Sequence, residues 1–227
     1  MALEQTAQKL GLSYRRIGLH AGERKAWRNE LTADWASVER TILTIYEREG
    51  WNGHDGEGGL ILSLIKAASF ATLPKKLHSV FIESLYYHRR YHDERGYECR
   101  VDPADMLESV RTTTAHQIAA NFAVMAVSEY STPLFFQTVT KEKVLGLFDA
   151  LGVERLHSIA TIFAEAPYEL RAGWPDLTLW RGHEVAFWEV KAPGDSMHAS
   201  QKRLIAKILK PLGYEVGLIE VANISTF

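Results

Sequence analysis

The stretch GWPDLTLWRGHEVAFWEVK, residues 173–191, contains two apolar runs separated by a short polar segment. Both runs are rich in branched and aromatic residues, and a glycine lies between them, which predicts strand, turn and strand. Asp176 precedes the first run, whereas Glu189 and Lys191 end the second. On adjacent antiparallel strands the two acids can lie side by side, and residues two apart on a strand point to the same face. The stretch therefore predicts two carboxylates and an ammonium on one sheet face.

These three side chains are suited to holding a hard divalent cation that activates water. Both acids belong to apolar runs, where an unpaired charge is costly. Carboxylate oxygens are ligands that Mg²⁺ prefers and Mn²⁺ accepts. A cation held there neutralises a phosphate and lowers the pKa of a water molecule. A nearby lysine stabilises negative charge in the transition state. We therefore expect a site for Mg²⁺ or Mn²⁺ formed by Asp176 and Glu189, with Lys191 beside it.

The rest of the chain supplies helices around this sheet. Apolar residues recur at helical spacing over 37–49, and a glycine-rich turn with an acid follows at 51–59. Further helical periodicity covers 77–90, 102–109, 115–129 and 141–151, and prolines mark the breaks. After the two strands come a helix over 201–209 and a strand over 214–221. The order predicts an α/β fold of the restriction-endonuclease-like PD-(D/E)xK type: helix, mixed β-sheet, helix and strand, with a large helical insertion between the first helix and the sheet.

The chain resembles the VRR-NUC branch of the PD-(D/E)xK nucleases, and most of all the C-terminal nuclease domain of the Fanconi-associated nuclease. The pieces that match lie in the same order as in the family: Val38-Glu39 through Tyr46, Gly56-Glu57-Gly58, residues 173–180, Glu189 to Asp195, Gln201 and the strand around Glu215-Val216. The resemblance covers about residues 35–222. It implies three divisions: a basic N-terminal arm or lead-in at 1–34, a nuclease domain at 35–222 with its insertion at about 70–165, and a tail at 223–227.

The resemblance also implies roles for individual residues. Glu57, Asp176, Glu189 and the backbone carbonyl of Val190 would bind the metal ions. Lys191 would orient or activate the attacking water and steady the phosphate charge. Gln201 would support the site from the following helix. From the sequence pattern alone, Glu57 is a solvent-facing turn residue, so only the resemblance nominates it.

The sequence departs from the Fanconi-associated type in three ways. Only about 35 residues precede the match, so DNA positioning by other domains is absent or supplied by a partner protein. In the Fanconi-associated type, the residue before the glutamine is often basic and helps to bind a terminal 5′ phosphate. Here that residue is Ser200, so the sequence does not predict capture of a 5′ end. The helical insertion occupies the surface that small stand-alone VRR-NUC proteins use to dimerise, which favours a monomer.

Composition narrows the class of protein. The chain has 227 residues, of which 46% are hydrophobic, and a single cysteine, Cys99, which rules out internal disulfides. No apolar run is long enough to span a membrane, and the N-terminus does not look like a signal peptide. We expect a cytoplasmic protein, nucleoid-associated if bacterial, whose partner is branched or flap DNA.

Charge is less decisive. The formal net charge is −2, whereas DNA-binding proteins usually carry a basic surface. The basic residues are grouped into three clusters: Arg15, Arg16, Arg24, Lys25 and Arg28; Arg89, Arg90, Arg95 and Arg100 among Tyr86, Tyr87, Tyr91 and Tyr97; and Arg203, Lys207 and Lys210. Each cluster is either a solvated face or a set of phosphate contacts.

Several readings stay open. The leading one is a metal-dependent, structure-selective DNA nuclease of repair or recombination; the alternatives are a non-catalytic DNA-binding or scaffolding protein, a Holliday-junction resolvase and a sequence-specific restriction enzyme. His88 and His92 have a spacing that suits zinc on a helix but lack an obvious third ligand, so we expect surface residues. Trp174 either packs in the core or contacts substrate.

Overall fold

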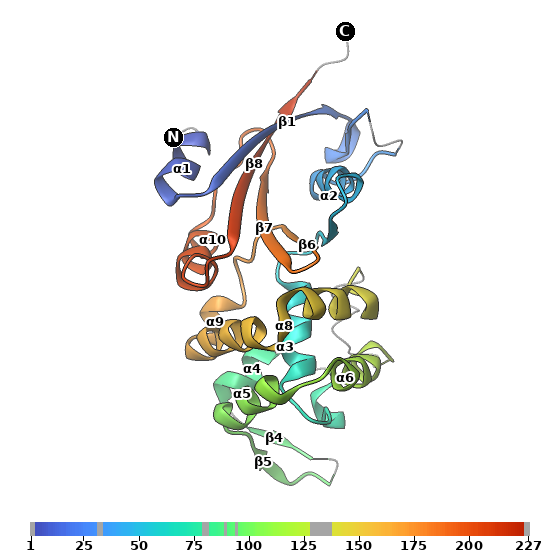
Figure 1. Cartoon of the computed structure of the whole chain (residues 1–227), viewed down its shortest axis with the longest axis vertical. Helices are drawn as coiled ribbons and strands as arrows, with labels where there is room; N and C mark the ends of the chain where they lie inside the picture. The colour runs from blue at the N-terminus through green and yellow to red at the C-terminus, as the bar shows by residue number, and fades with distance from the viewer. Residues whose placement is uncertain are drawn as a thin grey trace. The chain divides into compact units, whose positions relative to one another are not determined.

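The computed structural model describes residues 3–30, 34–78, 82–88, 90–93, 95–127 and 138–224. The chain forms two compact units (Figure 1). Unit 1 contains residues 1–57 and 173–227, and unit 2 contains residues 58–172. The division falls on either side of the predicted insertion, which extends further in both directions than the expected 70–165. Every predicted site residue belongs to unit 1.

Unit 1 is built on a six-stranded mixed sheet with the order β2-β1-β8-β7-β6-β3. Strands β1, β8 and β7 run parallel, whereas β6 and β3 continue the sheet in antiparallel fashion and β2 pairs antiparallel with β1. The strands are β1 (Ser13–Ala21), β2 (Trp27–Arg28), β3 (Asn52–His54), β6 (Leu177–Arg181), β7 (Glu184–Lys191) and β8 (Glu215–Asn223). The predicted strand–turn–strand is thus confirmed as β6 and β7.

The N-terminal segment differs from the expected loose arm. Helix α1 (Leu3–Leu10) precedes β1, and β1 pairs with β8 from Ser13 to Leu19. The sequence analysis missed this strand because its arginines suggested a solvated segment. In the structure they make contacts within unit 1: Arg15 lies over the Tyr46 ring, and Arg16 is 3.9 Å from Glu220. Long basic side chains can cover apolar surface with their stems while the charge stays in water. The arm expected over 1–34 is therefore wrong for residues 13–28.

One face of the sheet packs on α2 (Val38–Arg48). The Ser37 side chain accepts a hydrogen bond from the Arg40 backbone N–H and begins the helix. The apolar stripe of α2 packs against alternate residues of the strands, and this core contains Ile42, Leu43, Tyr46, Leu177, Leu179, Trp188, Val190 and Ile219. Residues of the opposite parity, including Phe187 and Glu189, therefore face the other side.

The second face is covered by α10 (Ala199–Leu204), which continues into a π-helical turn, η3 (Ile205–Leu209). Figure 1 shows α10 and α2 on opposite sides of the sheet. Leu204, Ile205 and Ile208 are buried, and the Phe187 ring contacts Tyr214 edge-on. This is the face on which Glu189 and Lys191 lie.

Unit 2 is mainly helical, but it also contains a two-stranded hairpin that the sequence analysis did not predict. Its elements are α3 (Gly59–Ala68), η2 (Lys75–Leu77), α4 (Ile82–His88), β4 (Arg90–His92), β5 (Glu98–Arg100), α5 (Pro103–Thr112), α6 (Ala115–Val127), α8 (Lys141–Glu165) and α9 (Pro167–Leu170). Gly152, with φ +68°, interrupts α8 near its middle. The expected helix over 141–151 is the first half of α8. No helix in the described part of the chain is long and apolar enough to cross a membrane.

Candidate active site

The β6–β7 register brings the two predicted acids together. Leu177 pairs with Trp188, so Asp176, one residue before β6, lies opposite Glu189. The Val190 backbone N–H donates a hydrogen bond to Asp176 Oδ2 at 2.8 Å, which fixes that carboxylate at the end of β7. Asp176 is half-buried and Glu189 is fully buried. Two carboxylates therefore share one largely dry position at the edge of the paired strands.

Two hydrogen-bond donors hold the Glu189 carboxylate, and both bind the same oxygen. Lys191 Nζ and Gln201 Nε2 both donate to Glu189 Oε1. Glu189 Oε2 is buried and has no hydrogen-bond partner. A buried carboxylate oxygen without a partner is costly, and in native proteins such a group calls for a specific explanation. The free oxygen is available to a ligand that brings positive charge.

Gln201 reaches Glu189 because α10 begins at the right place. Its Oε1 accepts a hydrogen bond from the His198 backbone N–H at 2.7 Å, which orients the amide nitrogen toward Glu189. Gly173 brings the Asp176 loop against the same helix. A Cβ at Gly173 would lie 2.3 Å from the Ser200 carbonyl carbon, and φ there is +93°. Only glycine fits this close approach without strain.

The environment of the site disfavours the charged form of both acids. Burial, and then the neighbouring Asp176 charge, raise the pKa of Glu189 to about 9, although Lys191 opposes the shift. Burial also raises the pKa of Asp176. One lysine thus faces two carboxylates that both resist ionisation. A divalent cation would remove this resistance, because it favours the charged form of both acids.

Glu57 lies near this pair but is not packed against it. Partial burial raises the pKa of Glu57, and so does the charge of Asp176, whereas Lys191 lowers it. Its side chain is exposed, and its φ of +43° is unusual for a residue other than glycine. Strained backbone of this kind concentrates at functional sites. Among the described residues, no three Asp, Glu, His or Cys side chains form a ready-made metal site, so Glu57 does not complete one in this structure.

The donor set nevertheless fits a hard cation. The partnerless Glu189 Oε2, the Asp176 carboxylate and the adjacent backbone of Val190 are oxygen donors of the kind that Mg²⁺ and Mn²⁺ prefer. Of the predicted site residues, Asp176, Glu189, Lys191 and Gln201 are brought together by direct contacts or register, and Glu57 is close enough for electrostatic coupling.

Two residues near the site had no role in the sequence analysis. Glu39, in the first turn of α2, is close enough to raise the pKa of both Asp176 and Glu57. His198, at the N-cap of α10, lowers the pKa of Glu57. Glu39 lies more than 130 residues from Asp176 in the chain, and only the packing of α2 on the sheet brings it near the acids.

The other candidates are now placed. Trp174 is 1% exposed and packs against Phe187, so it belongs to the core. His88 ends α4 whereas His92 lies in β4, so the two histidines do not share a helix. Arg89 of the middle basic cluster lies outside the described residues.

Comparison with known proteins identifies the family of the chain. The VRR-NUC domain family model matches residues 108–223, just over half of the chain, which includes Asp176, Glu189, Lys191 and Gln201 but not Glu57. No curated protein matches the sequence.

Solved structures extend the agreement to the whole fold. Crystal structures of paFAN1 bound to 5′-flap DNA with a gap match 99% of the chain. With a two-nucleotide flap the TM-score is 0.62 at 18% identity, and with a one-nucleotide flap it is 0.60 at 17% identity. The chain spans 42% of the length of those chains. The expected PD-(D/E)xK-like fold and the resemblance to the Fanconi-associated nuclease are confirmed. The chain belongs to the VRR-NUC domain family.

Proposed function

We propose that the chain is a divalent-metal-dependent deoxyribonuclease that hydrolyses phosphodiester bonds in flap or branched DNA, with a role in DNA repair or recombination. The observation that carries this proposal is the buried pair of Asp176 and Glu189, with one lysine to balance it and one carboxylate oxygen without a partner. Family membership supports the nuclease chemistry. The flap DNA in the related paFAN1 structures supports the choice of substrate.

The protein groups would share the work as follows. Asp176, Glu189, the Val190 carbonyl and Glu57 would hold the cation, with Glu57 moving toward the pair. A bound Mg²⁺ or Mn²⁺ supplies positive charge to the phosphate and lowers the pKa of the attacking water. Lys191 holds an ammonium beside the position where negative charge develops.

Gln201 would act as a positioning residue. Its contact is with Glu189 Oε1, which leaves the other oxygen without a hydrogen-bond partner and available to the cation. Because the Gln201 amide is itself held by the His198 backbone, the orientation of Glu189 is set before any ligand arrives. Such preorganisation lowers the reorganisation that the reaction requires.

Unit 1 also offers a route to the site. A cavity of about 580 Å³ is lined by residues of the loop that follows Lys191 and by the start of α2, including Lys25, Glu39, Ala192 and Asp195. Its charged lining consists of one basic side chain, Lys25, and two acidic ones, Glu39 and Asp195, so a DNA strand there would need a cation to offset the acids. A monomeric state, a partner protein that positions the DNA and a cytoplasmic or nucleoid location stay predictions.

The test is cleavage of 5′-flap, 3′-flap, four-way-junction and linear duplex DNA with Mn²⁺, Mg²⁺ or chelator. We expect metal-dependent cleavage with a preference for flaps. Asp176→Asn should abolish it, whereas Glu184→Gln, at the exposed far end of β7, should not. Preference for the four-way junction would identify a resolvase. Cleavage by Asp176→Asn at the wild-type rate, or DNA binding without cleavage under every metal condition, would contradict the proposal and favour a scaffolding protein.

A further inference from the structure

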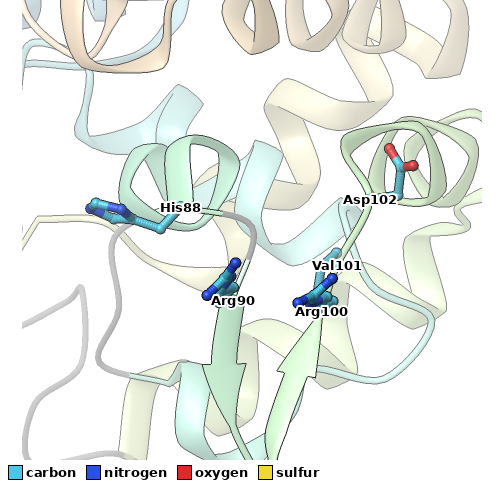
Figure 2. A pocket seen from close by; sticks show the side chains of 5 residues that line it. All are labelled: His88, Arg90, Arg100, Val101 and Asp102. Carbon is cyan, nitrogen blue, oxygen red and sulfur yellow. The ribbon is translucent and has the colours of Figure 1, made fainter.

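Unit 2 contains a second cavity, of about 390 Å³, lined by His88, Arg90, Arg100, Val101 and Asp102. Figure 2 shows Arg90 and Arg100 next to each other on the two strands of the β4–β5 hairpin. His88, at the end of α4, lies on one side of them, and Asp102, before α5, lies on the other. The catalytic pair in unit 1 does not use any of these residues.

The two arginines face one another directly. Arg90 and Arg100 are cross-strand partners in the β4–β5 register. Like charges at directly opposed positions destabilise a sheet. A two-stranded hairpin has little stability to spare, because an isolated hairpin is marginal in water. A local arrangement that weakens the fold without a structural gain is characteristic of a functional site.

The acids that the structure describes here balance only part of this charge. Among the described residues, Arg90 and Arg100 share a single carboxylate, Glu98, at 3.7 and 3.6 Å. The Asp102 carboxylate accepts a hydrogen bond from the Ala104 backbone N–H at 2.9 Å, since it caps α5. The arginine side chains are 58% and 76% exposed, so most of their donors are accessible. Paired guanidinium groups are well suited to an anion such as phosphate, which they can bind in a bidentate manner.

Aromatic rings adjoin the cationic pocket. The His88 ring contacts Tyr87 at 4.9 Å and Tyr168 at 6.3 Å between centroids, and Arg171 lies over the Tyr168 ring. Tyr87 and Tyr168 touch edge-on, yet they are 61% and 38% exposed. The edge-on packing leaves ring surface open to solvent. Exposed aromatic rings beside arginines form the usual binding surface for single-stranded nucleic acid, because every base can stack on them.

We propose that this Arg90–Arg100 pocket binds an internal phosphodiester of single-stranded DNA, with a neighbouring base on Tyr87 or Tyr168. The phosphate occupies the position between the two guanidinium groups and offsets their repulsion. A single strand is favoured over a duplex because the bases of a duplex are stacked on one another and offer no free face. That the single strand is DNA rests on the proposed function. That the pocket binds a phosphate beside a stacked base rests on the residues of the pocket itself.

The test is fluorescence-anisotropy binding of a short labelled thymidine oligonucleotide in chelator, so that cleavage cannot contribute. We compare the wild type, the double variant Arg90→Gln/Arg100→Gln and the control Arg111→Gln, an exposed arginine of α5 in the same unit. The double variant should bind at least about tenfold more weakly. The slope of log affinity against log salt should fall by about 0.7 for each lost phosphate contact. The control should bind as the wild type does.

A variant that is expected to bind more tightly shows that weaker binding by the arginine variant is not caused by misfolding. Glu98→Gln removes the anion that competes for both arginines, so single-strand affinity should rise, by up to about fivefold. Tyr87→Ala should weaken binding about tenfold, whereas Tyr87→Phe, which keeps the ring, should not. The thermal midpoint of the double arginine variant should equal or exceed that of the wild type.

Three results would overturn the inference. The first is unchanged affinity in the double arginine variant. The second is weaker binding by Glu98→Gln, which would make the arginines structural partners of that acid. The third is binding only to an oligonucleotide with a 5′-terminal phosphate, which would make the ligand a phosphomonoester. Failure of the nuclease proposal can be told apart from failure of this inference. If the protein binds the oligonucleotide through the two arginines but cleaves no DNA, the pocket is supported and the nuclease proposal is contradicted.

Discussion

Two antiparallel hairpins, β6–β7 and β4–β5, each place like charges across from one another, but with opposite sign and in different surroundings. In unit 1, Asp176 lies opposite the fully buried Glu189. In unit 2, Arg90 is paired with Arg100 on an exposed hairpin. Each pair has one counter-charge, Lys191 for the acids and Glu98 for the arginines. For each hairpin we propose a ligand of the opposite sign: a cation at the acids and a phosphate at the arginines.

Burial explains why electrostatic interactions are stronger at the acidic pair than at the arginine pair. Burial raises the pKa of both acids, and the nearby Asp176 charge, which is poorly screened there, raises that of Glu189 further. The arginines are in contact with water, which screens them. We therefore expect a tightly held metal and large mutational effects at β6–β7, and a salt-sensitive ligand and small effects at β4–β5.

The largest effect should come from breaking the acidic pair. Asp176→Asn keeps the acceptor for the Val190 N–H but removes one charge, so cleavage should fall by about 10³-fold or more. In chelator the same variant should unfold at a higher temperature than the wild type, because a carboxylate whose ionisation burial disfavours is replaced by a neutral amide. Cleavage assays and thermal denaturation measure the two effects. A loss of both activity and stability would mean that Asp176 is mainly structural.

The next effect should come from moving the acids without changing a charge. Gly173→Ala places a methyl group against the Ser200 backbone at a left-handed φ, so we expect a loss of about 2–4 kcal/mol of stability. Cleavage should fall with it, because Asp176 and Gln201 lose their alignment. Gly182→Ala, in the β6–β7 turn where φ is +55° and no atom lies within 4 Å of the added methyl group, is the matched control. It should lose about 1 kcal/mol through backbone strain alone. Equal losses in chemical denaturation would show that the close approach has no special role.

A pair of opposite charges provides a contrast with both hairpins. Lys66 is 3% exposed, donates to the His78 carbonyl at 3.2 Å and is attracted by the buried Glu83. Burial lowers the pKa of Lys66 from 10.5 to about 8. The unfolded chain therefore binds this proton more tightly, so the cost to stability is full below pH 8. The cost falls as pH rises through 8 and vanishes above 10.5.

Lys66→Met should accordingly stabilise unit 2 by about 1–2 kcal/mol near neutral pH, and the gain should shrink toward pH 10.5. Urea denaturation at several pH values measures it, with the exposed Lys141→Met as the control. A gain in stability that does not change with pH would show that the cost does not come from keeping the buried lysine charged.

The smallest effect should come from the arginine pair in the absence of DNA. Arg100→Gln removes the cross-strand repulsion and should raise stability by about 0.2–1 kcal/mol. Arg111→Gln loses a two-pronged contact with Glu108 and should lower stability slightly. Differential scanning calorimetry in low salt compares the two. A drop in stability with Arg100→Gln would show that Glu98 holds the hairpin together through that arginine.

Much of unit 1 could be predicted because its signals are local. The two apolar runs and the turn in residues 173–191 indicate the hairpin, and the spacing of Glu189 and Lys191 indicates their shared face. The strand β1 could not be predicted in this way, since its arginines make it look like a solvated arm until Tyr46 and Glu220 are placed beside it. Glu39 and the Gly173 contact likewise depend on long-range packing. In unit 2 the hairpin was missed because β4 and β5 are only three residues each, too short for a period of two to stand out.

The most direct test of the central claim is calorimetric titration of Mn²⁺ into the DNA-free protein. The claim is that the buried acids of β6–β7 are arranged for a cation. We expect the wild type and the Arg90→Gln/Arg100→Gln variant to bind Mn²⁺ equally well, and Asp176→Asn to show little or no binding. Equal binding by Asp176→Asn and the wild type would place the metal elsewhere and contradict the assignment of this hairpin as the catalytic site.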